Sequence, residues 1–310
     1  MTAVKWTPAE IPDLSGKRAL VTGVTGGLGE QTALELARSG AEVILAARTR
    51  SKLDSVVESV RRAVPGAEVR PLLMDLADLD SVRRAAAEAA SYGPLDILVN
   101  NAGVMATPNR RTKDGFDLQF GTNHLGHFAL TGLLLPQLSA SSGSRVVTVT
   151  SHAHRMTRGV RLGDPRIDHG RYGKWSSYFR SKLANLLFAF ELDRRARDLG
   201  LPIASLGAHP GYADTNLMSA GLNMDGTKAD GAIIVAVTRL VGQSSAAGAW
   251  PSLMAATMVS LPGGTYVGPG GFGQLNGPPK VVRAARAAHD RQMAAKLWSI
   301  SEEATGVHYL

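Results

Sequence analysis

The chain has 310 residues, of which 44% are hydrophobic and 19% are charged. This composition excludes a disordered or fibrous chain and provides enough apolar side chains for a buried core. Because the chain has no cysteine, it can form no disulfide, no cysteine-ligated zinc site and no thiol nucleophile. Neither a basic, apolar leader nor a window of 18 purely apolar residues occurs. We therefore expect a soluble cytoplasmic protein without stable membrane insertion.

The net charge of +8, from 34 basic and 26 acidic residues, is unevenly distributed. Residues 145–200 hold 12 of the basic and 5 of the acidic residues, so the rest of the chain is nearly neutral. A protein that binds nucleic acid would carry a basic stripe interleaved with aromatic residues, and no such stripe occurs. The sequence therefore predicts no nucleic-acid partner. The basic segment is either a solvated surface or a rim that attracts an anionic cofactor or substrate.

Short apolar runs alternate with segments of helical periodicity along the chain. The expected strands are 17–24, 43–47, 69–74, 95–100, 145–150, 203–206 and 265–267. The expected helices are 29–39, 52–64, 80–92, 125–138 and 178–199. Strands that are apolar throughout are typical of a parallel sheet covered on both faces. The pattern predicts one α/β Rossmann domain over residues 1–310, a doubly wound parallel sheet of about seven strands, with an embellishment at about 214–263.

A glycine cluster follows the first strand and opens the first helix, with the spacing G-x-x-x-G-x-G. Such a turn lets the backbone approach a pyrophosphate, which the free N–H groups of a helix N-terminus attract. Taken alone, the cluster could also be an ordinary tight turn. The spacing, preceded by Thr22, resembles the short-chain dehydrogenase/reductase superfamily. This resemblance implies a nicotinamide cofactor held by Gly23, Thr25, Gly27, Leu28 and Gly29.

The end of the second strand bears on the choice of cofactor. A carboxylate there would bind the ribose 2′-hydroxyl of NAD(H), but the chain has Ala47 followed by Arg48. Because a planar guanidinium suits a 2′-phosphate, we expect NADP(H) rather than NAD(H). The alternative is that Arg48 is only a surface charge beside the helix.

Other strand ends add cofactor contacts that the resemblance implies. Asp75, at the end of the third strand, resembles the adenine-contacting aspartate of the superfamily, and it could equally be a turn carboxylate. An Asn-Asn-Ala-Gly motif closes the fourth strand, where the superfamily braces its sheet and lines the cofactor. The superfamily pattern assigns the further contacts to Leu76, Asn101, Ala102, Gly103, Tyr178, Lys182, Pro210, Gly211 and Thr215.

Tyr178 and Lys182 lie four residues apart at the start of an expected helix, so they share one face. A nearby ammonium and a nicotinamide cation would lower the pKa of the tyrosine. The tyrosine could then exchange a proton with an alcohol or a carbonyl. Such a pair is common by chance, but its place after the fifth strand matches the superfamily. Ser151, at the end of that strand, matches the serine that orients the substrate, and Thr150 is its nearest competitor.

Asn123 matches the asparagine that interrupts a helix in the superfamily. Its side chain would hold a water that links Lys182 to bulk solvent, although Asn123 could instead be a helix N-cap. A group of histidines could suggest a metal site, but no carboxylate or cysteine completes a ligand set nearby. We expect no metal and assign these residues to polar lining or helix edges: His124, His127, His152 and His154.

The resemblance to the superfamily covers about residues 14–275. Four motifs resemble its retinol dehydrogenase-like, WW-domain oxidoreductase-like and protochlorophyllide reductase-like branch: Ala47-Arg48, Ser151-His152-Ala153-His154, His209-Pro210-Gly211 and Lys296-Leu297-Trp298-Ser299. The resemblance implies a bulky, apolar aldehyde, ketone or alcohol as substrate. The loop between Ser151 and Tyr178 is unusually long and basic, and it is either a solvated loop or a site for an acidic head group. The expected substrate walls are Met105, Ala106, this loop and the segment 214–250.

The leading hypothesis is an NADP(H)-dependent oxidoreductase that interconverts a carbonyl and an alcohol of a small-molecule substrate, with Tyr178 as general acid/base. One alternative is an NADPH-dependent reductase of a carbon–carbon double bond. The other is a cofactor-sensing protein without activity, which would be expected to lose some of Asn123, Ser151, Tyr178 and Lys182. Helices 125–138 and 178–199 carry wide apolar faces that could pair in a homo-oligomer or pack on the chain's own sheet. A basic helix near residues 283–296 could cap the site.

Overall fold

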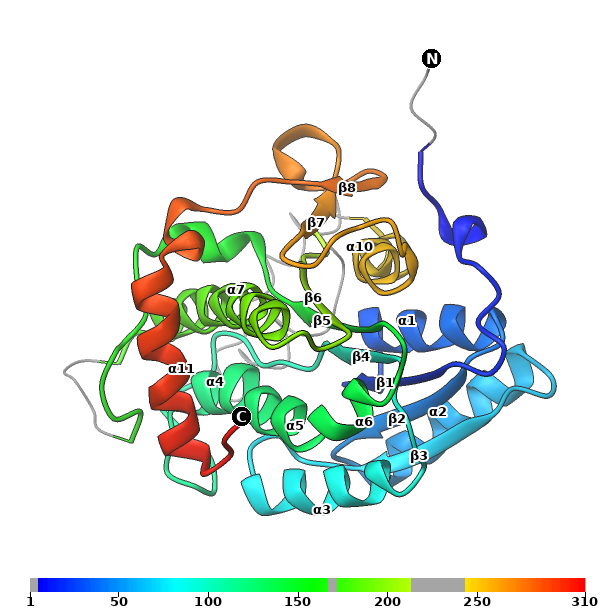
Figure 1. Ribbon diagram of the computed structural model, residues 1–310, viewed down its shortest axis with the longest axis horizontal. Coiled ribbons are helices and arrows are strands. Elements are labelled where there is room, and N and C mark those ends of the chain that lie inside the picture. Colours follow the sequence, from blue (N-terminus) through cyan, green and yellow to red (C-terminus); the bar gives the residue numbers. More distant parts are fainter. Residues whose placement is uncertain (1–4, 167–171, 213–242, 310) are drawn as a thin grey trace.

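A single sheet lies at the centre of the computed structural model, with helices on both faces (Figure 1). The structure describes residues 5–166, 172–212 and 243–309. In this part of the chain the strand order is β3-β2-β1-β4-β5-β6-β7-β8. All neighbouring strands are parallel except β7 and β8. The strands are β1 (Arg18–Thr22), β2 (Glu42–Ala47), β3 (Val69–Leu73), β4 (Ile97–Asn100), β5 (Ser144–Val149), β6 (Ile203–Ala208), β7 (Tyr266–Pro269) and β8 (Pro279–Val281).

Two apolar layers of helices cover this sheet. Along β1, Ala19 and Val21 face one layer and Leu20 faces the other, as the alternation of side chains in a strand requires. The first layer contains α1 (Gly27–Arg38), α2 (Arg50–Ala63) and α10 (Ser245–Thr257). The second contains α3 (Leu79–Ala90), α5 (Gly126–Leu133), α6 (Leu135–Ser139), α7 (Lys174–Asp198) and α11 (Arg291–Thr305). This is the doubly wound Rossmann fold that the sequence predicts.

Two helices and one edge of the sheet differ from those expected. The helix expected at 125–138 begins with α4 (Leu118–Phe120), continues through a π-helical turn (Gly121–Leu125), and breaks at Leu134 between α5 and α6. The helix α7 begins at Lys174, so Tyr178 lies one turn inside it. At the edge of the sheet, β8 adds an eighth strand that the sequence analysis did not predict, and it runs antiparallel to β7.

Part of the expected embellishment is a core element. The helix α10 packs against α1, and Leu253 and Ala255 are fully buried in the first layer. The residues 213–242 lie outside the described part of the chain. The described portion of 214–263 therefore completes the layer beside β5, β6 and β7.

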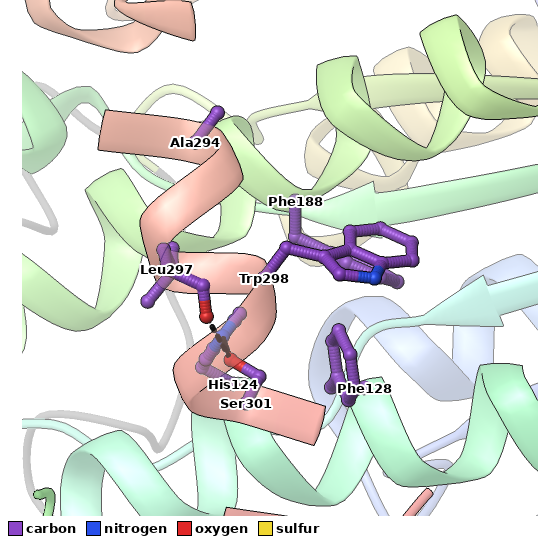
Figure 2. A pocket seen from close by; sticks show the side chains of 7 residues that line it. All are labelled: His124, Phe128, Phe188, Ala294, Leu297, Trp298 and Ser301. Carbon is purple, nitrogen blue, oxygen red and sulfur yellow. Dashed lines mark hydrogen bonds between the residues drawn. The ribbon is translucent and has the colours of Figure 1, made fainter. Parts of the chain in front are cut away.

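The C-terminal helix α11 covers the apolar faces of the helices expected at 125–138 and 178–199. From the sequence, these faces could pack on the chain itself or pair in a homo-oligomer. The helix α11 lies across α7 and α5 in Figure 1. Figure 2 shows the space between these helices, lined by side chains from all three and from the π-helical turn, with no room for a water molecule. Trp298 packs edge-on against Phe128 and stacks with Phe188. These faces of α5 and α7 are thus buried within one copy of the chain.

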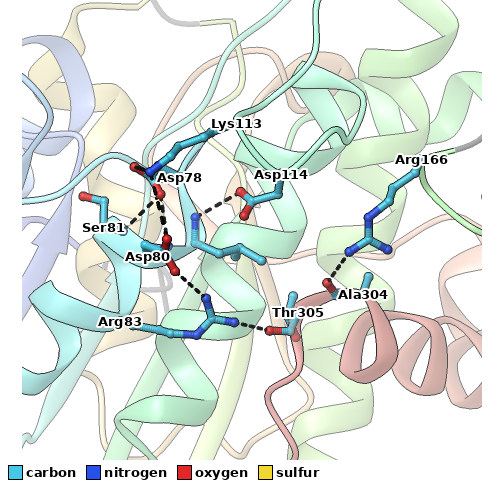
Figure 3. Close-up of polar contacts among 10 residues, drawn as sticks. Asp78, Asp80, Ser81, Arg83, Lys113, Asp114, Arg166, Ala304 and Thr305 are labelled. Carbon is cyan, nitrogen blue, oxygen red and sulfur yellow. Dashed lines mark hydrogen bonds and ion pairs between the residues drawn. The ribbon is translucent and has the colours of Figure 1, made fainter.

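Two arginine side chains donate hydrogen bonds to backbone carbonyls at the C-terminal end of α11 (Figure 3). Arg83 donates to the carbonyl of Thr305 at 2.8 Å, and Arg166 donates to the carbonyl of Ala304 at 3.2 Å. Cations at this end satisfy free carbonyls and complement the helix dipole. Arg166 also lies over the ring of Phe116, 4.6 Å from its centre. One cation of the basic loop is therefore a structural anchor.

Candidate active site

The residues predicted for the site line one edge of the sheet. Carboxyl ends of parallel strands meet at such an edge, and the strand order reverses there between β1 and β4, which opens a crevice. Six of the predicted residues come one or two positions after the end of a strand: Asp75 after β3, Arg48 after β2, Gly23 after β1, Asn101 after β4, Ser151 after β5 and Pro210 after β6.

The glycine turn between β1 and α1 depends on the absence of side chains. Gly23 has a φ of +72°, and a Cβ at this position would lie 2.7 Å from the Cα of Ala102. A Cβ on Gly29 would lie 2.3 Å from the carbonyl oxygen of Gly23. The turn therefore brings the start of α1, with Gly27 and Leu28 in its first turn, to the crevice edge. This cradle fits the pyrophosphate of a dinucleotide.

Thr22 and Asn101 brace the floor of this cradle. The hydroxyl of Thr22 accepts the backbone N–H groups of Asn101 and Ala102, both at 2.9 Å. The side-chain amide of Asn101 donates to the carbonyl of Thr22 at 2.7 Å. Thr22 is fully buried, so these bonds satisfy groups that water does not reach. The end of β4 and the glycine turn are thereby held together.

Arg48 and Asp75 lie farther along the same edge. The side chain of Arg48 is exposed, and within the described part of the chain no hydrogen bond or ion pair holds it. Asp75 accepts the N–H of Ala77 at 2.9 Å. It is therefore a turn carboxylate, which was the alternative to an adenine contact. Its adenine contact stays a prediction. Leu76 is buried beneath this turn, and Thr25 is exposed.

Tyr178, Ser151 and Lys182 come together at the end of β5. The Nζ of Lys182 lies 5.8 Å from the centre of the Tyr178 ring and donates to the carbonyl of Val149 at 3.3 Å. Burial raises the pKa of Tyr178 to about 12, and the nearby Ser151 hydroxyl acts in the opposite direction. Burial lowers the pKa of Lys182 to about 8.

The chain by itself does not have the lowered tyrosine pKa that is expected beside a nicotinamide cation, and the effect of a bound cofactor stays a prediction. Desolvation of the tyrosinate is the largest influence on Tyr178. The same burial disfavours the ammonium of Lys182, which reduces its charge near neutral pH. In the chain without a cofactor, Tyr178 therefore holds its proton at neutral pH.

Asn123 lies in the π-helical turn and is fully buried. Its side chain accepts the N–H of Val104 at 2.7 Å and donates to the carbonyl of Val104 and the hydroxyl of Ser181, both at 2.9 Å. The turn is continuous with the helix before it, so Asn123 is no N-cap. Its side chain ties the loop after β4 to α7, and its role in holding a water stays a prediction. Its Oδ1 lies beside Gly103, whose added Cβ would come 3.1 Å from it.

The ring of His154 forms a hydrogen bond with the backbone of Ser151, a contact that the sequence analysis did not predict. Its Nδ1–H donates to the carbonyl of Ser151 at 2.7 Å, and its Nε2 accepts the N–H of Ala285 at 3.0 Å. Burial lowers the pKa of His154 to about 4, which keeps the ring neutral. The serine at the end of β5 is thus linked to the segment after β8. The Ser-x-x-His spacing is the only sequence signal for this contact.

The turn after β6 is held by two hydrogen bonds. Gly211 donates its N–H to the Nδ1 of His209 at 3.2 Å, and the amide of Gln243 donates to the carbonyl of Pro210 at 2.7 Å. His209 is fully buried. Thr215 lies outside the described residues, as does most of the expected wall at 214–250.

Apolar side chains pack around Tyr178. Met105 and Ala106 are buried in one cluster with Tyr178, and Ala153, Trp175 and Phe179 pack against them. The rings of Trp175 and Phe179 stack with their centres 6.3 Å apart. Ala106 has a φ of +52°, and its N–H donates to Gln119 at 2.9 Å. The two substrate-wall residues expected from the loop after β4 are therefore beside the tyrosine.

Two absences complete the description of these residues. In residues 5–166, 172–212 and 243–309, no three His, Cys, Asp or Glu side chains gather as a metal site would require. Over the same ranges, no helix has both the length and the apolar composition needed to cross a membrane.

Comparisons with known proteins agree with this geometry. The sequence pattern of the family described as short chain dehydrogenase matches residues 17–162. The chain is 37% identical to retinol dehydrogenase 13 of Homo sapiens over 297 residues, which cover 95% of this chain and 86% of that protein. It is 37% identical to polyprenol dehydrogenase of Mus musculus, with 96% and 87% covered.

Solved structures include one of similar fold and sequence. A crystal structure of a protein from Mycobacterium paratuberculosis matches with a TM-score of 0.79 and 41% identity, and 99% of this chain and 100% of that chain are covered. These relatives identify the chain as an oxidoreductase of the short-chain dehydrogenase/reductase superfamily, in its retinol dehydrogenase-like branch.

Proposed function

We propose that the chain interconverts a carbonyl and an alcohol on a bulky, apolar substrate, with NADP(H) as cofactor and Tyr178 as general acid/base. The observation that carries this proposal is the buried pair of Tyr178 and Lys182 at the end of β5, with the Lys182 Nζ 5.8 Å from the centre of the Tyr178 ring and the Ser151 hydroxyl near enough to lower the pKa of Tyr178. A bound nicotinamide would supply or accept the hydride at the substrate carbon. Gly23, Gly27 and Gly29 would hold the pyrophosphate, and Lys182 would bond the cofactor ribose.

Tyr178 would move the proton that balances the hydride. In the reducing direction the carbonyl oxygen takes the proton from the Tyr178 hydroxyl, and in the oxidising direction the alcohol returns it. Ser151 accepts the N–H of Ala153 at 3.2 Å, and with a substrate bound its own proton would be donated to the substrate oxygen. Because the pKa of Tyr178 is raised to about 12 in the chain alone, the proton needed for reduction is already in position.

The preference for NADP(H) is proposed from the end of β2. Ala47 leaves no carboxylate for a ribose 2′-hydroxyl, and the exposed guanidinium of Arg48 is suited to a 2′-phosphate. Since Thr22 pairs with Ala46 in the sheet, the end of β2 that carries Arg48 lies beside the strand end that leads into the glycine turn. Both features favour NADP(H) over NAD(H).

The apolar substrate class is proposed from the cluster around Tyr178. Met105, Trp175 and Phe179 form an apolar cluster with Tyr178. Two relatives are named for retinol and polyprenol, which are both long apolar alcohols. An unbranched apolar aldehyde or prenyl-type aldehyde is therefore a suitable first substrate.

The test is the oxidation of NADPH by the purified chain in the presence of apolar aldehydes, with small polar aldehydes as a matched set. The proposal expects turnover that increases with the apolar length of the aldehyde and exceeds that with NADH. Turnover limited to small polar aldehydes would contradict the substrate class. NADPH binding without turnover of any carbonyl would contradict the reaction.

A further inference from the structure

We infer that His127 is a positioning residue whose ring couples the floor of the cofactor cradle to Asn123 through two directed hydrogen bonds. The inference rests on the proposed cofactor site, because Thr22 is the part of that site which His127 contacts. His127 is one of the histidines for which the sequence offered only a metal or a polar-lining role. It lies on α5, immediately after the π-helical turn that carries Asn123.

One end of the ring reaches the cradle. The Nε2 of His127 lies 2.9 Å from the hydroxyl of Thr22. That hydroxyl already accepts the N–H groups of Asn101 and Ala102, so its own proton remains to be donated. The carbonyl of Val99 is a second acceptor at 3.4 Å, and the imidazole nitrogen is nearer.

The other end of the ring reaches Asn123. The Nδ1 of His127 lies 3.0 Å from the Asn123 carbonyl oxygen. A carbonyl can only accept, so the ring proton must be on Nδ1. In a neutral ring, Nε2 is then the acceptor for the Thr22 hydroxyl. The two contacts therefore select one tautomer, and each atom involved has a defined role as donor or acceptor.

The surroundings keep this tautomer neutral. His127 is almost fully buried, and burial lowers its pKa to about 4; the bond to Asn123 raises the pKa and the charge of Lys182 lowers it. The neighbouring His124 is buried too, with a pKa lowered to about 3. A charged ring would have a proton on Nε2 and would lose the bond from Thr22.

The linkage reaches the catalytic tyrosine in two further steps. Asn123 donates to the Ser181 hydroxyl at 2.9 Å, and that hydroxyl donates to the carbonyl of Tyr178 at 2.8 Å. Thr22 is thus linked to the backbone of Tyr178 by hydrogen bonds on both sides of Asn123, from His127 to its backbone carbonyl and from its side-chain amide to Ser181. A phenylalanine of similar volume would fill the space of His127 but leave a buried hydroxyl without its nearest acceptor.

Two substitutions separate the two ends of the ring. His127→Asn places an amide donor near the position of Nδ1 and keeps the bond to Asn123, but it does not reach Thr22. His127→Gln places its amide oxygen near Nε2 and keeps the bond from Thr22, but it loses the bond to Asn123. We expect H127N to weaken NADPH binding about tenfold with kcat nearly unchanged, and H127Q to lower kcat about tenfold with NADPH binding nearly unchanged. Substituting the exposed His308 by Asn and by Gln is the matched control and is expected to change neither.

A readout without cofactor keeps this inference separate from the proposed function. In the cofactor-free protein, ¹⁵N NMR should find the His127 proton on Nδ1 between about pH 6 and pH 8. A proton on Nε2, or a charged ring in this range, would overturn the inference whether or not NADPH binds. Failure of the wild-type chain to bind NADPH, with the Nδ1 tautomer present, would instead contradict the proposed function.

A double-mutant cycle tests the coupling itself. Thr22→Val and His127→Phe each remove one partner, and the free energy of unfolding is measured for both variants and for their combination. If the bond exists, the combined loss is smaller than the sum of the single losses, because either substitution alone already breaks it. Additive losses would contradict the coupling.

Discussion

The ammonium group of Lys182 lies 5.8 Å from the centre of the Tyr178 ring, and both side chains are buried. A lysine so close to a tyrosine favours the tyrosinate, whereas burial favours the neutral form of each group. In the chain alone burial prevails, since the pKa of Tyr178 is raised to about 12 and that of Lys182 is lowered to about 8. The pair is therefore set to donate a proton, and a cationic nicotinamide would be needed to shift it towards accepting one.

The glycine turn gives a first prediction. Gly29→Ala places a Cβ about 2.3 Å from the carbonyl oxygen of Gly23, so α1 must move away from the turn. We expect NADPH affinity, measured by titration of its fluorescence, to fall by about tenfold or more. Gly159→Ala is the control, because its added Cβ meets only the end of Met293 at 3.6 Å. Equal affinity in the two variants would contradict the cradle.

Arg48 gives a second prediction. Arg48→Asp replaces a cation suited to a 2′-phosphate by a carboxylate suited to a 2′-hydroxyl. We expect kcat/KM to fall with NADPH and to rise with NADH, so that the preference reverses. Lys52→Asp makes the same change of charge at an exposed position on α2 and is expected to leave the preference unchanged. A wild-type chain that already prefers NADH would refute the role of Arg48.

Four buried histidines make stability depend on pH. Burial lowers the pKa values of His127 and His154 to about 4 and those of His124 and His209 to about 3. Because an unfolded histidine binds its proton near pH 6.5, the unfolded chain binds more protons below that pH, and stability falls as the pH falls. We expect a loss of about 1 kcal/mol for each ring by about pH 5.5. Urea unfolding at several pH values measures this loss, and a free energy that is constant from pH 7 to pH 5.5 would exclude it.

His154 gives a fourth prediction. His154→Phe removes the bonds to the Ser151 carbonyl and from the Ala285 N–H, which leaves both backbone groups without this partner. We expect the free energy of unfolding to fall by about 1–3 kcal/mol and kcat to fall with it. The exposed His289, stacked on Phe190, is the control for replacing a histidine by phenylalanine. An H154F chain with wild-type stability and kcat would show that Ser151 needs no such support.

The strands and the order of site residues could be predicted because they depend on local patterns. Apolar runs mark β1 to β6 to within a few residues, and the site residues follow their ends. The strand β8 has only three residues, with Lys280 and Val281 exposed, so it lacks an apolar run. The π-helical turn at Asn123 has the same hydrophobic spacing as a regular helix and could not be distinguished from one.

The contacts of His127 with Thr22 and of His154 with Ala285 could not be predicted because these partners are distant in sequence. Thr22 lies 105 residues before His127, and Ala285 lies 131 residues after His154. Nothing near either histidine indicates which partner the fold brings to it. The same holds for the pKa of Tyr178, since the lysine four residues away is visible in the sequence and the burial that outweighs it is not.

The most direct test of the proposed chemistry compares Tyr178→Phe with the wild-type chain in NADPH oxidation with an apolar aldehyde, together with NADPH binding by each. The substitution keeps the ring and removes only the hydroxyl, so the fold and the cradle are expected to persist. The account predicts that kcat falls by about 10²–10⁴ while the Kd for NADPH stays within about threefold. A Tyr178→Phe chain that turns over at the wild-type rate would contradict the assignment of the proton to Tyr178.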